Sequence, residues 1–80
     1  MSVKSEPMAE PPFRVLIVDD DSVQCRLSEA HVARAGGAVE IAGDLATARA
    51  VLARAPQRFA ALFLDLGLPD GSGLDLLREL

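Results

Sequence analysis

Three short stretches of continuous apolar residues alternate with stretches of helical periodicity along the chain. The apolar stretches are 13–18, 38–42 and 59–64. Runs of this length without polar alternation are typical of strands that are buried on both faces of a parallel sheet. Strands separated by helix-length segments pair in parallel through right-handed crossovers, because a hairpin cannot reach a parallel neighbour. The pattern therefore predicts an α/β fold with three strands and three helices in alternation.

Turn and capping residues set the bounds of the first predicted helix, over 22–35. Asp21 or Ser22 is available as N-cap, and a glycine pair follows the last apolar position. Apolar or semi-apolar residues recur every four positions, at Val23, Leu27, His31 and Ala35. This spacing is typical of a helix.

Similar signals mark the other two helices. Asp44 can cap a helix over 45–55, which Pro56 ends. The run from Asp70 to Gly73 has turn chemistry, and Ser72 with Asp75 forms a capping box for a helix from Leu74 onward. The leader, 1–12, is rich in Pro and Glu and is expected to lie outside the folded domain, 13–80.

Length and composition limit the function classes. Eighty residues make one small domain or part of one, which excludes most autonomous enzymes, and we expect no enzyme here. The net charge of −4 disfavours direct contact with nucleic acid or an anionic membrane surface. Cys25 is the only cysteine, so no internal disulfide forms, and neither a membrane span nor a signal peptide is evident. A cytoplasmic location is expected.

Two of the apolar stretches end directly in carboxylates. Asp19, Asp20 and Asp21 follow the first stretch, and Asp65 follows the third. In open parallel sheets the ligand site lies beyond the carboxyl ends of the strands, so these side chains converge if the two strands are neighbours. An all-oxygen cluster of this kind suits Mg²⁺, and a carboxylate beside Mg²⁺ is a suitable nucleophile for a phosphoryl group.

The segments VLIVDDDS at 15–22 and LFLDLGLPDGSGLDLLREL at 62–80 resemble the receiver domain of two-component response regulators. The resemblance implies a flavodoxin-like, doubly wound parallel sheet of five strands in the order 2-1-3-4-5. Residues 13–80 cover the first three strands and helices of that fold. Strands 4 and 5 and their helices, with the phosphate-contacting Thr or Ser and Lys, would follow Leu80.

The resemblance also implies roles for individual residues. Asp65 would accept phosphate from a histidine kinase or phosphotransfer protein. Asp20 would bind Mg²⁺ directly, Asp19 would help through a bound water, and the backbone carbonyl of Gly67 would be a further ligand. Pro69 and Gly73 would shape the loop that follows Asp65. An isolated chain of these residues would expose its third strand, and we expect it to self-associate there.

Two other functions remain open at this stage. Residues 19–23, DDDSV, formally match the D-x-D-x-[TV] motif of haloacid dehalogenase-type phosphatases, with Asp19 as nucleophile and Asp21 as general acid. That alternative leaves the segment after Asp65 unexplained. The second alternative is a receiver-like module that acts only by protein interaction. The residue that becomes phosphorylated distinguishes the first alternative from the receiver.

Overall fold

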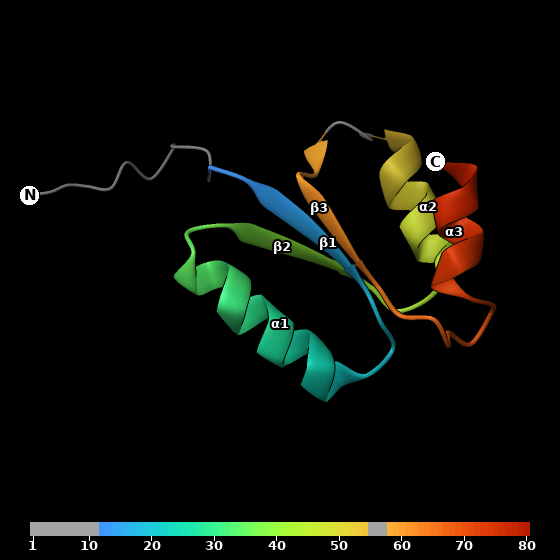
Figure 1. The fold of residues 1–80 in the computed structure, drawn as a ribbon, viewed down its shortest axis with the longest axis horizontal. Coiled ribbons are helices and arrows are strands. Elements are labelled where there is room, and N and C mark those ends of the chain that lie inside the picture. The colour runs from blue at the N-terminus through green and yellow to red at the C-terminus, as the bar shows by residue number, and fades with distance from the viewer. Residues whose placement is uncertain (1–11, 55–57) are drawn as a thin grey trace, which may run out of the picture.

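Three strands alternate with three helices in the computed structural model, which describes residues 12–54 and 58–80 (Figure 1). The elements are β1 (Arg14–Val18), α1 (Ser22–Arg34), β2 (Ala38–Ala42), α2 (Leu45–Arg54), β3 (Ala61–Leu64) and α3 (Gly73–Glu79). The predicted order is confirmed, and the second strand has the predicted bounds. The third strand begins at Ala61 and not at Phe59, because residue 58 lies in a short turn of 3₁₀ helix.

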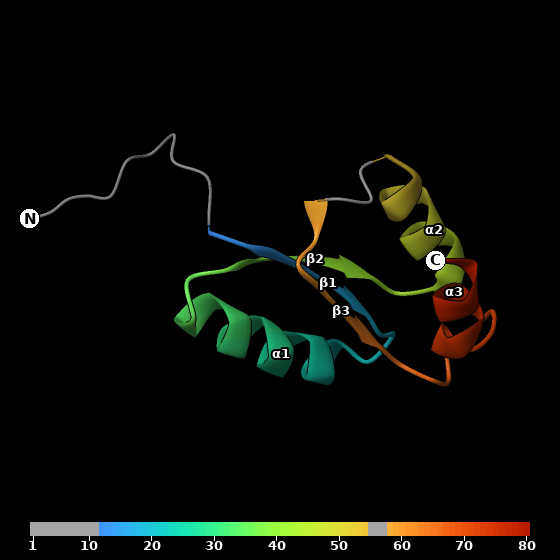
Figure 2. The same cartoon turned by 45° about the horizontal axis from the view of Figure 1, so that its top comes forward.

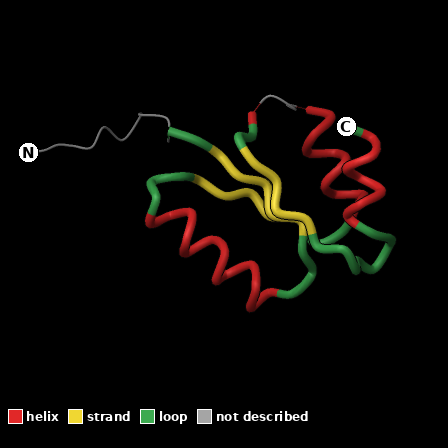
Figure 3. The backbone as a smooth tube through the Cα atoms, in the orientation of Figure 1, coloured by secondary structure: helices red, strands yellow, loops and turns green. Residues whose placement is uncertain are grey.

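The strands form one parallel sheet in the order β2-β1-β3. Leu16 of β1 lies opposite Glu40 of β2 and Leu62 of β3. Figure 3 shows the three strands running in the same direction between the helices. The central strand is therefore the most deeply buried element, and β1 and β3 are neighbours, as convergence of the carboxylates requires.

Helices cover both faces of the sheet, as expected for the first half of a doubly wound fold. In Figures 1 and 2, α1 lies on one side of the sheet and α2 with α3 on the other. Side chains along β1 alternate between two hydrophobic clusters because successive residues of a strand point to opposite faces. Leu16 and Val18 pack towards α2 and α3, and Val15 and Ile17 pack towards α1.

The residues spaced four apart do not form the buried face of α1. Val23 is 65% exposed, Leu27 is 53% exposed, and His31 also faces solvent. The buried residues are Cys25 and Val32, which lie seven positions apart and so share one face over two turns. At the first turn of the helix, the Cys25 Sγ donates to the Asp19 carbonyl oxygen at 3.3 Å. The periodicity located the helix but not the side that packs.

The predicted caps are all present. Asp21 caps α1 by accepting from the Val23 and Gln24 amides at 2.9 and 3.2 Å, and Asp44 accepts from the Thr47 amide at 2.7 Å. Ser72 and Asp75 form the predicted capping box. Each cap satisfies amides that have no partner within the helix, so the chain reverses direction at fixed points beside the sheet.

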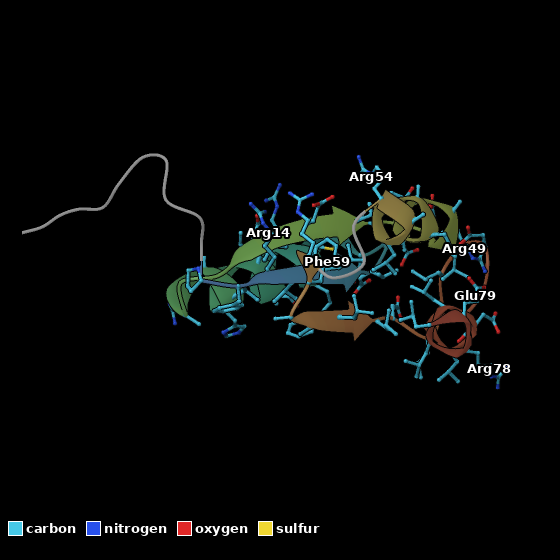
Figure 4. The ribbon with its side chains drawn as sticks, turned by 90° about the horizontal axis from the view of Figure 1, so that it is seen from above. Arg14, Arg49, Arg54, Phe59, Arg78 and Glu79 are labelled. Atoms are coloured by element: carbon cyan, nitrogen blue, oxygen red, sulfur yellow. The ribbon has the colours of Figure 1, made fainter. Side chains whose placement is uncertain are left out.

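An ion pair joins α2 and α3 on the outer surface of their layer. Arg49 donates to Glu79 through Nε at 2.9 Å and Nη2 at 2.7 Å (Figure 4). The hydrogen bond with Glu79 raises the pKa of Arg49, and the same bond lowers the pKa of Glu79. Bidentate geometry of this kind fixes orientation as well as distance. The two helices are thereby held side by side.

Some expectations fall outside the described residues. One concerns the leader, of which residues 1–11 are not described. The other is the predicted end of the second helix at Pro56, which is not described either. Among the helices that the structure describes, none has the length and apolar character needed to cross a membrane.

Candidate functional site

Backbone hydrogen bonds place Asp19 and Asp65 side by side beyond the ends of β1 and β3. The Asp65 amide donates to the Val18 carbonyl at 2.8 Å, and the Asp19 amide donates to the Ala42 carbonyl at 3.0 Å. The strand pairing thus extends for one more bond past the last strand residues. Both carboxylates are therefore positioned by the sheet and not by a loose loop.

Asp19, Asp20 and Asp65 form one acidic cluster. Each offers a carboxylate oxygen, and these oxygens lie within 4.8 Å of one another. Asp19 and Asp65 are half-buried and Asp20 is exposed. Three oxygen donors at this spacing, open to solvent on one side, fit a small divalent cation that keeps several waters, as Mg²⁺ does. Without a cation, the like charges would repel one another.

The other predicted site residues lie around this cluster. The Gly67 amide donates to Asp65 Oδ1 at 3.1 Å, which places Gly67 beside the Asp65 carboxylate. The role of its carbonyl as a metal ligand stays a prediction. The Asp21 amide donates to Asp19 Oδ1 at 2.9 Å, whereas the Asp21 side chain accepts from the first amides of α1. Asp21 is a helix cap and not a member of the cluster.

A cavity of about 550 Å³ opens beside the cluster, between the start of α1 and the end of β2. Its lining includes Asp19, Asp20, Glu29 and Asp44, with Arg26 as a cation. The Cys25 thiol also lines it, and burial, together with the nearby Asp19 carboxylate, raises the pKa of that thiol. The Cys25 side chain packs in the cluster of Val15, Ile17 and Val32 between β1 and α1.

The loop after Asp65 closes tightly on itself, and Gly73 is the residue that permits this. The Gly73 amide donates to the Asp65 carbonyl at 2.9 Å. A Cβ at position 73 would collide with that same carbonyl oxygen. Sequence reasoning assigned Gly73 to turn chemistry and missed this approach between two backbones, because the contact depends on how the third strand and the third helix pack.

Replacing Gly73 with alanine should destabilise the chain. The colliding atom is backbone, so relief requires movement of the chain at Asp65, directly after β3, and overpacking of this kind costs about 1–3 kcal/mol. Gly43→Ala is the matched control, since a Cβ there meets no atom within 4 Å. Urea unfolding of both variants measures the difference. Equal stability of the two variants would contradict the contact.

Two curated proteins are similar to this chain. The transcriptional regulatory protein AruR of Pseudomonas aeruginosa is 41% identical over 70 residues, and the probable transcriptional regulatory protein TcrX of Mycobacterium tuberculosis is 39% identical over 69. The alignments cover 84% and 86% of this chain, and both relatives are response regulators. The chain is therefore similar to response regulators, and the part that it resembles is their receiver domain. The chain spans 29% of the length of each relative.

This receiver has the three strands and three helices that the family places first, in the expected spatial order. No family model matches the chain, and no solved structure matches it significantly. Assignment to the receivers therefore rests on the two relatives, on the sheet topology and on the two acidic motifs that the sheet brings together.

Proposed function

We propose that this receiver accepts a phosphoryl group on Asp65. The observation that supports the proposal most is the cluster of Asp19, Asp20 and Asp65 at the carboxyl end of neighbouring parallel strands, with donor oxygens within 4.8 Å. Of the three, Asp65 follows β3 and begins the loop that Gly73 closes. Its carboxylate is partly buried, held by the sheet and open to an incoming phosphate.

The proposed transfer takes the phosphoryl group from a phosphohistidine. An Asp65 carboxylate oxygen attacks phosphorus in line as the phosphorus–nitrogen bond breaks, and the departing imidazole nitrogen keeps the electron pair of that bond. The product is an acyl phosphate on Asp65 and a free histidine. The phosphoryl group adds charge and oxygen acceptors, which can bias a conformational equilibrium.

We propose Mg²⁺ as the cofactor, held by Asp19, Asp20 and Asp65 with the carbonyl of Gly67. The donor chemistry supports this choice, because carboxylate and carbonyl oxygens with water are the ligands that Mg²⁺ prefers. A bound Mg²⁺ would neutralise charge on the transferring oxygens. The contribution of the chain itself is to hold the three carboxylates together despite their mutual repulsion.

The partner in this proposal is a histidine kinase or a phosphotransfer protein in the cytoplasm. The chain would act as a phosphorylated signalling module and not as an enzyme. The relatives are named as transcriptional regulatory proteins, so we propose transcriptional control as the output of the whole protein. Because the net charge of these 80 residues is −4, contact with DNA would belong to other residues.

The phosphatase alternative is disfavoured by the position of Asp21. A general acid must reach the leaving group, but the Asp21 side chain accepts two amides of its own helix at 2.9 and 3.2 Å. The intact acidic cluster disfavours an interaction module that is never phosphorylated. In such a module the mutual repulsion of the three carboxylates would cost stability without any function in return.

The position of the acyl phosphate tests the proposed function. The chain is incubated with a small acyl phosphate, with and without Mg²⁺, and the product is trapped by borohydride reduction and mapped by mass spectrometry. The expected result is modification at Asp65 that requires Mg²⁺. Modification at Asp19 would favour the phosphatase. The interaction module predicts no modification even when the Thr or Ser and the Lys that would follow Leu80 are included.

A further inference from the structure

The loop from Asp65 to Gly73 forms a closed frame. Its two ends are joined by the bond from the Gly73 amide to the Asp65 carbonyl, at 2.9 Å. Within it, Leu68 and Gly71 form an isolated antiparallel bridge, with amide-to-carbonyl distances of 2.8 and 3.3 Å. A frame with its own internal bonds moves as a unit, so whatever anchors it also orients the Asp65 carboxylate.

Asp70, near the tip of this frame, reaches the N-terminus of α2. Its Oδ1 accepts from the Leu45 amide at 2.8 Å, and its Oδ2 accepts from the Ala46 amide at 3.1 Å. These bonds, first the one from Leu45, lower the pKa of Asp70, so the carboxylate stays ionised at neutral pH. The frame also packs there, because Leu68 and Leu45 are buried in the same cluster.

The helix does not depend on Asp70 alone for a cap. Asp44 already satisfies the Thr47 amide, as an ordinary N-cap does, and the Ala48 amide bonds to the Asp44 carbonyl at 3.1 Å. Asp70 takes the two amides that remain, at Leu45 and Ala46. Asp44 caps α2 from the residue directly before it, and Asp70 adds a second carboxylate from the loop that follows Asp65. Asp70 therefore links that loop to α2.

We propose that Asp70 is a positioning residue, which ties the loop of the phosphoacceptor to α2 and so fixes the orientation of Asp65. The proposal rests on the proposed function as far as phosphoryl transfer is concerned. The ion pair of Arg49 with Glu79 joins α3, which follows the loop, to the same helix. Loop, α2 and α3 therefore form one block, in which the Asp70 carboxylate makes the hydrogen bonds between the loop and α2.

The test compares Asp70→Ala with Asp44→Ala. Both variants remove a carboxylate from the N-terminus of α2, but only the first detaches the loop. We expect both to lower the melting temperature, and only Asp70→Ala to speed amide hydrogen exchange at Gly67 and Gly73. In the folded protein at matched Mg²⁺, phosphorylation by a small acyl phosphate should slow about tenfold in Asp70→Ala alone, because a misplacement of 1 Å can cost roughly 100-fold.

Asp70→Asn provides a rescue experiment. Its remaining oxygen can accept from the Leu45 amide, so it should restore much of the rate and of the exchange protection. Unchanged exchange in the loop of folded Asp70→Ala would overturn the proposal. Exchange that rises in a chain that is never phosphorylated would support the tie and reject the proposed function, so the two failures are distinguishable.

Discussion

Asp65→Asn should reduce phosphorylation by a small acyl phosphate to background. Asparagine has the size and shape of aspartate, but its amide is a poor nucleophile for phosphorus. The variant should fold, because an amide oxygen at this position can still accept from the Gly67 amide. It also removes one charge from three crowded carboxylates, so the metal-free variant should be at least as stable as the parent chain.

Asp44→Asn is the matched control for this variant. Asp44 follows β2 at the same end of the sheet, and asparagine preserves its cap on the Thr47 amide. Mass spectrometry of the intact chain measures the phosphorylated fraction, and circular dichroism confirms folding. Labelling that persists in Asp65→Asn and disappears in Asp19→Asn would contradict the receiver assignment of the nucleophile.

An isolated chain of these 80 residues should self-associate through β3. Among the described strands, β3 pairs only with β1, which leaves its other edge without a partner in the described residues. Phe63 on that strand is 44% exposed, and Leu66 beyond it is 61% exposed. An apolar edge strand that carries no charge is a template for strand addition.

A lysine at this edge tests the expectation. Ala61→Lys places a charge on β3 at an exposed position, so little packing is lost. Association should weaken by at least about tenfold, which corresponds to roughly 1.4 kcal/mol. Val23→Lys adds the same charge at an exposed apolar position of α1 and should leave association unchanged.

Sedimentation equilibrium over a range of protein concentrations measures both variants. Equal weakening by the two substitutions would indicate a general charge effect and not a β3 interface. A chain that stays monomeric at every concentration would show that the exposed edge is too short to pair.

The sequence was sufficient for the order of elements and for the acidic site, because both depend on local signals. Continuous apolar runs located the strands. The carboxylates directly after β1 and β3 lie close together as soon as those two strands pair in parallel. The caps at Asp21, Asp44 and Ser72 were also predictable, since a cap is decided within a few residues.

The features that sequence reasoning missed depend on contacts between distant segments. The four-residue spacing located α1 but did not indicate that Cys25 and Val32 would be its buried residues. Asp70 was assigned to a turn, and nothing local indicates that it reaches amides 24 and 25 positions earlier. The available signal was indirect: Ser72 already caps the helix that follows this turn, so the Asp70 carboxylate has no capping role of its own there.

The position of β1 in the centre of the sheet has a consequence for the biogenesis of the site. Among the described strands β1 comes first in the chain, so it has neither neighbour until β2 has emerged, and its second edge stays open until β3 follows. Asp19 and Asp20 are therefore present early, but Asp65 joins them only when the last of these strands docks. The acidic cluster is therefore complete only once β3 has paired with β1, so its formation depends on the last of the described strands.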